Sequence, residues 1–194
     1  MMERHELMAA SVATAARGGG LSEEDVALLG RAHALAMEPR VATIEDDHDP
    51  AYLHPGRTVL VLLQDVRDVP VDALCAAAVH ETERTDLRVG VDEVRRVLGD
   101  RVADIVEALP LPGDERLLER LVTLDRPSLL AALAERLDQL RHAHLREDPV
   151  WWKALYEEAG GAWVPIAERT HARLADRYRH WYRTFGRRLA KVGG

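Results

Sequence analysis

The sequence predicts an all-α fold, and two observations carry that prediction. In most segments of the 194-residue chain, apolar residues recur at the 3.6-residue spacing of an amphipathic helix. Between these segments lie prolines and glycines, which interrupt helices and mark turns. No repeat, low-complexity tract or long linker divides the chain, so we expect a single domain over residues 1–194. Within it, residues 1–20 form an N-terminal helix and residues 148–194 a C-terminal helical extension packed on the rest.

The first two helices have clear boundary signals. Residues 6–17 are rich in alanine and end at three consecutive glycines, 18–20. Ser22 begins a capping-box sequence, in which its hydroxyl accepts from a free backbone amide of the first turn. The helix that it opens carries apolar residues at helical spacing, and we expect it to end at Pro39.

The middle of the chain predicts two more helices. After an acidic loop at residues 45–50, Pro55 stands in the first turn of a helix, where its missing N–H costs nothing. Residues 59–66 continue this helix, although their β-branched side chains leave a short strand as the alternative. Asp72 should cap a helix of small residues that runs from position 73 to about position 82.

The second half of the chain continues the helical pattern. Residues 91–98 and 101–109 form two amphipathic helices on either side of Gly99. Beyond the break at Pro110 and Pro112-Gly113, we expect further helices at residues 115–124, residues 127–145, a segment opened by Pro149, and one long terminal helix at residues 163–192.

The composition excludes several classes of protein. The chain carries 26 Lys and Arg against 33 Asp and Glu, a net charge of −7, whereas a nucleic-acid binder needs a basic face. A single cysteine, Cys75, excludes a disulfide framework and a cysteine-based zinc site. The longest apolar run, residues 73–79, is too short to span a membrane. We therefore expect a cytoplasmic protein without nucleic-acid or membrane partners.

One histidine stands out among the nine in the chain. His80 closes the apolar run at residues 73–79 and is followed directly by Glu81. A buried histidine–carboxylate pair must be satisfied by hydrogen-bond partners or by a cation. The residues alone leave both alternatives open, because no other metal or nucleophile motif is present in the sequence.

Four stretches of the sequence, taken in order, resemble a known enzyme family. They are Ala32-His33, Tyr52-Leu53-His54-Pro55, Ala78-Val79-His80-Glu81 and Leu133-Ala134-Glu135-Arg136-Leu137-Asp138-Gln139-Leu140-Arg141. Together they resemble the HD-domain phosphohydrolases of the RelA/SpoT alarmone-hydrolase type over roughly residues 25–180. The resemblance implies an HD-domain helical bundle.

The resemblance also implies a metal site. Members of the family bind one divalent metal, usually Mn²⁺, through two histidines and two aspartates. The corresponding positions of this sequence are His33, His80, Glu81 and Glu135, so that both aspartates are glutamates. The carboxylates are kept and each side chain is one methylene longer, which changes the geometry around the metal. Iron is the alternative metal, in a site repurposed for redox chemistry.

The family's catalytic and substrate positions are less well preserved. An acidic pair that positions the attacking water corresponds here to Arg84 and Thr85. The neighbouring Glu83 and Asp86 are therefore our candidates for the water-positioning role. Arg84 and Arg40 are the candidates for contact with a substrate phosphate, because guanidinium groups bind phosphate through charged hydrogen bonds.

Two functions follow from this reading. One is a metal-dependent phosphohydrolase of a nucleotide or nucleoside polyphosphate, resembling a (p)ppGpp hydrolase, in which the metal activates a bound water. The other is a degenerate, non-catalytic HD-domain protein that binds or regulates. In the second, the guanidinium of Arg84 would pair with Glu81 and replace the cation electrostatically.

Two structural alternatives also remain open. Periodicity places Glu135 off the leucine stripe of its helix and predicts that it is solvated, whereas the resemblance predicts that it points inward. The aromatic residues gathered in the C-terminal 44 positions either cover the core or form the surface of a homodimer; they are Trp151, Trp152, Tyr156, Trp163, Tyr178, Trp181, Tyr182 and Phe185.

Overall fold

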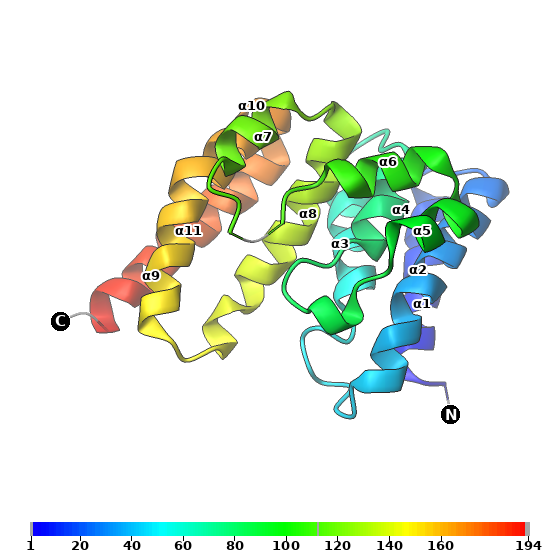
Figure 1. Ribbon diagram of the computed structural model, residues 1–194, viewed down its shortest axis with the longest axis horizontal. Helices are drawn as coiled ribbons and strands as arrows, with labels where there is room; N and C mark the ends of the chain where they lie inside the picture. The colour runs from blue at the N-terminus through cyan, green and yellow to red at the C-terminus, as the bar shows by residue number, and fades with distance from the viewer. Residues whose placement is uncertain (1, 112, 193–194) are drawn as a thin grey trace.

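The computed structural model describes residues 2–111 and 113–192, and throughout these residues the regular structure is helical (Figure 1). The prediction of an all-α fold is confirmed. The α-helices are α1 Arg4–Gly18, α2 Glu23–Thr43, α3 His54–Asp65, α4 Val71–Val79, α5 Val91–Leu98, α6 Asp100–Ala108, α7 Leu117–Thr123, α8 Arg126–His142, α9 Pro149–Glu158, α10 Val164–Thr170 and α11 Ala172–Val192. Short 3₁₀ turns lie at Thr85–Leu87 and Ala143–Leu145, and a π-helical segment lies at Ala159–Trp163. Among these helices, none is long and apolar enough to cross a membrane.

Helix α4 lies at the centre of the fold. Every residue from Ala73 to Val79 is buried, and α2, α3, α6 and α8 all pack against this helix. Because the α4 side chains are small, four neighbouring helices approach its backbone closely. Figure 1 shows α8 between the helices of the N-terminal half and the group formed by α9, α10 and α11. Helix α8 is therefore covered on two sides.

Several predicted helix starts are confirmed. The Ser22 hydroxyl accepts from the backbone N–H of Asp25 at 3.1 Å and caps α2. Helix α3 starts at His54 with Pro55 in its first turn and continues as helix to Asp65, so the alternative of a strand at residues 59–66 is wrong. Its β-branched side chains face the buried side of α3, where packing outweighs their weak helix propensity.

The prediction that Pro39 ends α2 is wrong, because the helix continues to Thr43. A proline inside a helix removes one backbone hydrogen bond. Here the next residue, Arg40, is buried and donates to the carbonyls of Ala36 at 2.7 Å and Ala51 at 3.0 Å. The hydrogen bonds from Arg40 to Ala51 and Glu81, which both lie outside α2, hold residue 40 in place and offset the bond lost at Pro39.

Two other predicted boundaries are also wrong. Helix α4 is preceded by Pro70 and ends at Val79, so Asp72 lies in its first turn and His80 has extended backbone. Extension at His80 turns the chain toward α8. The expected terminal helix at residues 163–192 is divided at His171, whose φ of −161° and ψ of 127° separate α10 from α11.

The C-terminal aromatic residues fix α11 on α8. The Tyr178 hydroxyl donates to the Leu133 carbonyl at 2.7 Å, and the Trp181 indole donates to the Leu140 carbonyl at 2.6 Å. Trp152, Trp163, Tyr178, Trp181 and Phe185 are all buried within the chain. These five side chains thus cover the core, as the first of the two sequence alternatives expects, and a homodimer through this region stays a prediction.

Candidate functional site

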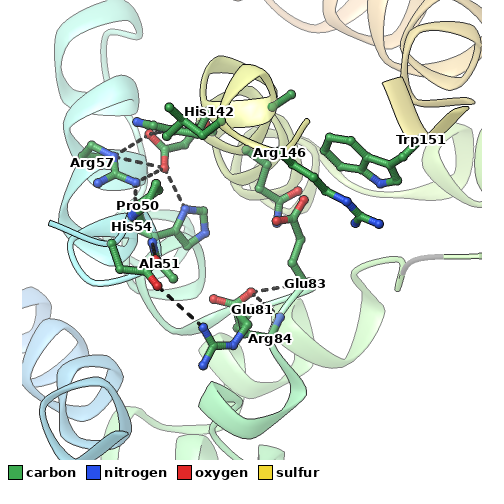
Figure 2. Close-up of a pocket in the computed structure, with 15 residues that line it drawn as sticks. Pro50, Ala51, His54, Arg57, Glu81, Glu83, Arg84, His142, Arg146 and Trp151 are labelled. Carbon is green, nitrogen blue, oxygen red and sulfur yellow. Dashed lines mark hydrogen bonds and ion pairs between the residues drawn. The ribbon is translucent and has the colours of Figure 1, made fainter. Parts of the chain in front are cut away.

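A cavity of about 290 Å³ opens between α3, α8, α9 and the turn that follows α4. Figure 2 shows His54 and Arg57 on one side of this pocket and Arg146 and Trp151 on the other, with Glu83 between them. The pocket brings together residues from four parts of the chain. Its lining includes Glu81, Glu83 and Arg84 after α4, and Asp138, Gln139 and His142 on α8.

Glu135 is the centre of a buried hydrogen-bond network. Its Oε2 lies 2.5 Å from Nδ1 of His80, while its Oε1 accepts from the Thr82 amide at 3.0 Å and the Thr82 hydroxyl at 2.8 Å. The Gln139 amide donates to the same Oε1 at 3.1 Å. Burial alone would raise the pKa of Glu135, but the charge and hydrogen bond of His80 and the donor Thr82 lower the pKa to about 2. Both carboxylate oxygens are therefore occupied.

Glu81 is paired with a buried arginine. Its Oε2 accepts from Nη2 of Arg40 at 2.5 Å, and its Oε1 accepts from the backbone amides of Glu83 at 2.9 Å and Arg84 at 3.0 Å. The Arg40 and Glu81 side chains are only 1% and 3% exposed. A buried carboxylate requires a positive partner, and Arg40 supplies it here. The guanidinium that pairs with Glu81 therefore belongs to Arg40 and not, as the sequence suggested, to Arg84.

His33 lies apart from this network. It is buried on α2, and its Nε2 has no hydrogen-bond partner within the described residues. A Cβ placed on Gly56 of α3 would stand 3.3 Å from that Nε2, so the ring packs directly against the α3 backbone. Burial, with smaller contributions from His5 and Arg40, lowers the pKa of His33 to about 4. The ring is neutral at pH 7.

His54 and Asp138 form a second buried pair, which the sequence analysis did not include in the site. Nδ1 of His54 lies 2.8 Å from Oδ2 of Asp138, and the Arg57 guanidinium donates to both oxygens of that carboxylate at 2.8–3.2 Å. Burial would raise the pKa of Asp138, but the hydrogen bonds from His54 and Arg57 hold it well below its usual range. For His54, burial lowers the pKa, and the hydrogen bond and charge of Asp138 outweigh burial and raise it.

Of the remaining predicted site residues, Glu83 and Arg84 line the pocket, and Asp86 is paired with Arg84. Arg84 donates to both oxygens of Asp86, at 3.0 and 2.7 Å, and so neutralises that carboxylate. Glu83 lines the pocket, and its nearest ion-pair partner is Arg136 at 3.9 Å. Burial raises the pKa of Glu83. Of the two candidates for water positioning, Glu83 alone retains an uncommitted carboxylate.

The predicted metal ligands do not fit a metal ion in this arrangement. The carboxylates of Glu81 and Glu135 use all four oxygens to accept from arginine, histidine, threonine and backbone donors, and the Nε2 of His33 packs against the α3 backbone at Gly56. Over residues 2–111 and 113–192, no group of three or more His, Cys, Asp or Glu side chains is placed to hold a metal.

A sequence signal for the missed residues does exist. Glu135, Asp138, Gln139 and His142 follow the i, i+3, i+4, i+7 spacing and so share one face of α8. A polar stripe on a helix normally faces water. Here Glu135 and Asp138 are 3% and 1% exposed, so this second face of α8 is buried as well.

Acid should destabilise the protein through Glu135. Because its pKa is depressed from 4.5 to about 2, its contribution to stability is fully present above about pH 4.5 and is lost as the pH falls through about 2. The variant Glu135→Gln should show a smaller decrease in the free energy of unfolding over this range. Urea denaturation at a series of pH values measures this free energy of unfolding. The variant Glu24→Gln, at an exposed position, is the control. A wild-type profile that matched Glu135→Gln would contradict the buried network.

The chain matches no protein-family model and no curated protein sequence.

Proposed function

We propose that this protein is a degenerate, non-catalytic HD-domain-like binding protein, in which a buried arginine replaces the catalytic metal. One observation carries the proposal, namely the Arg40–Glu81 ion pair, at 2.5 Å and almost fully buried. A metal at Glu81 would bring a second cation beside the Arg40 guanidinium, in a region where water screens neither charge. Arg40 thus serves the electrostatic role of a cation and provides no open coordination position for a reacting water.

The ligand that we propose is a small nucleotide or a related phosphoester. The imidazole of His54 projects into the pocket (Figure 2), and its Nε2 is buried without a hydrogen-bond partner among the described residues. With Nδ1 hydrogen-bonded to Asp138, a protonated His54 offers Nε2–H as a donor to a phosphate oxygen. On the opposite side, the Arg146 guanidinium lies 4.6 Å from the centre of the Trp151 ring. This stacked pair offers a planar surface for a base.

The metal-dependent phosphohydrolase is the second candidate, and one feature favours it. His54 and His80 each have Nδ1 hydrogen-bonded to a carboxylate and a buried Nε2 with no partner in the described part of the chain. Histidines that bind metals commonly have their second nitrogen oriented in this way. The carboxylates of Glu81 and Glu135, which the metal would need beside these histidines, are already occupied by other donors, and for this reason we place the hydrolase second.

Metal analysis combined with ligand titration distinguishes the two functions. The purified protein is loaded with Mn²⁺, desalted and analysed by mass spectrometry, and nucleoside mono-, di- and triphosphates are then titrated calorimetrically. We expect less than about 0.1 equivalent of retained metal, and binding of a nucleotide without release of phosphate. Arg146→Ala should weaken that binding about tenfold, whereas Arg116→Ala, at an exposed arginine outside the pocket, should not change it.

Other results would contradict the proposal. Close to one equivalent of metal, lost in His80→Ala and accompanied by phosphate release, would establish the hydrolase instead. Binding that Arg146→Ala left unchanged would remove this pocket as the nucleotide site.

A further inference from the structure

The C-terminal helix α11 has a charge opposite to that of the whole protein. The chain carries a net charge of −7, whereas α11 contains seven arginine and lysine residues and a single acidic residue, Asp176. The basic residues are Arg173, Arg177, Arg179, Arg183, Arg187, Arg188 and Lys191. Such a separation of charge creates a local positive field on an otherwise acidic molecule, and this field attracts anionic partners.

A groove runs along the line where α11 packs on α8. It consists of two adjoining cavities of about 500 and 710 Å³, which share Arg141, Trp181 and Thr184 in their walls. The larger cavity is lined by the cations Arg141, Arg187, Arg188 and Lys191, and its described lining contains no carboxylate. In the smaller cavity, Asp65 is already paired with Arg177 at 2.6 Å, and Asp176 with Arg179 at 2.6 Å. The groove therefore has unbalanced positive charge.

Arg141 is the clearest sign of this imbalance. It is exposed, lies where the two cavities meet, and forms no ion pair with any acidic side chain in the described residues. Burial and the neighbouring charge of Arg177 lower its pKa. A cation that lies beside other cations is stabilised when an anion binds next to it.

The shape of the groove suits a segment of peptide. Arg173 and Lys191 are 18 positions apart on α11, so the basic wall is about 27 Å long. An extended peptide of about eight residues has this length. Leu140, Trp181 and Phe185 form an apolar floor on which side chains of such a segment can pack.

Other elongated anions suit the groove less well. Trp181 and Phe185 are stacked on each other with their ring centroids 4.6 Å apart, so one face of each ring is already covered and closed to a nucleic-acid base. A nucleic acid longer than the groove would also meet the acidic remainder of the chain. A membrane surface is flat on this scale and does not reach the floor of a concave groove.

We propose that the groove between α8 and α11 binds an acidic segment of a partner protein, with carboxylates on the arginine walls and apolar side chains on the floor. Arginine clusters recognise acidic motifs in this way, because the guanidinium fork matches a carboxylate. This site is separate from the pocket that contains His54, so either proposal can fail while the other holds.

The test uses a fluorescein-labelled peptide of about eight alternating Glu and Leu residues, titrated with the full chain and followed by fluorescence anisotropy. We expect saturable binding that weakens as salt is added. The double variant Arg187→Glu/Lys191→Glu should weaken binding at least about tenfold. Both side chains are exposed and form no ion pair with a described acidic side chain, so the variant should fold normally, which circular dichroism verifies. The matched control Arg31→Glu/Arg126→Glu makes the same charge change on exposed residues outside the groove, and it should bind like the wild type.

Four results would overturn the proposal. One is absence of peptide binding, and another is equal weakening by the control pair. The third is tighter binding of a single-stranded oligonucleotide of equal charge, or of phosphatidylglycerol vesicles, than of the peptide. The fourth is self-association in light scattering that Arg187→Glu/Lys191→Glu abolishes, which would assign the groove to a second copy of this chain.

Discussion

Replacing Arg40 by methionine should lower the free energy of unfolding by about 3–5 kcal/mol. Methionine keeps most of the apolar volume of the arginine but leaves the Glu81 carboxylate buried without its cation. It also removes the side-chain hydrogen bond that Arg40 donates to the Ala51 carbonyl. Because a domain of this size is stable by about 5–15 kcal/mol, the loss is a large fraction of the total. Urea denaturation followed by circular dichroism measures it.

A double variant separates the ion pair from the effect of volume. Arg40→Met/Glu81→Gln removes both charges, and we expect it to recover a substantial part of the stability lost in Arg40→Met. The exposed Arg96→Met is the control and should change stability by less than about 0.5 kcal/mol. If Arg40→Met cost less than about 1 kcal/mol, Glu81 would have a different partner in solution, and the electrostatic basis of the proposed function would fail.

Replacing Asp138 by asparagine should cost about 3 kcal/mol and should lower the pKa of His54. The Asp138 carboxylate neutralises Arg57 and holds Nδ1 of His54 at 2.8 Å. Without that negative charge, burial dominates the ionisation of His54 and disfavours the imidazolium. NMR titration of the His54 ring measures the pKa, and urea denaturation measures the stability.

The matched control for Asp138→Asn is Asp65→Asn. Asp65 is also buried on the α3–α8 side of the molecule and is paired with an arginine, Arg177, but it forms no hydrogen bond with His54. The variant Asp65→Asn should therefore leave the pKa of His54 unchanged. A His54 pKa that stayed the same in Asp138→Asn would show that the His54–Asp138 contact does not control the charge of the imidazole.

The His54–Asp138 pair also determines how the stability of the protein changes with pH. The raised pKa of His54 contributes stability that is fully present below about pH 6.5 and is lost as the pH rises through the folded-state value. The depressed pKa of Asp138 has the opposite effect in acid. A binding pocket that depends on protonated His54 should therefore bind a phosphate ligand more weakly as the pH rises through the folded-state pKa of His54.

The helical segments could be predicted from the sequence where the local signal is strong. Ser22 and Pro55 mark the first turns of α2 and α3 through their own backbone and side-chain chemistry, and the structure confirms both. The same local reasoning fails at Pro39 and His171. At Pro39, hydrogen bonds made by Arg40 to distant residues keep the helix intact. At His171, an extended backbone turns the chain so that α11 packs on α8.

Within the site, the sequence indicated His80, Glu81 and Glu135 but not their partners. The apolar run before His80 predicted that His80 and Glu81 are buried and need partners, and in the structure both are buried and paired. Which group pairs with each depends on distant parts of the chain. Arg40 is 41 positions from Glu81, and Glu135 is 55 positions from His80.

The sequence by itself determined the all-α class, the position of most helices and the burial of the segment around His80. Only the tertiary structure decided that Glu135 and Asp138 face the interior. The spacing of apolar residues reveals one buried face of a helix, whereas α8 is covered by other helices on two sides. It also decided that Arg40 is the positively charged partner of Glu81. A buried charge is stabilised by whichever opposite charge the fold brings within a few ångströms, and that distance is a property of the packed chain.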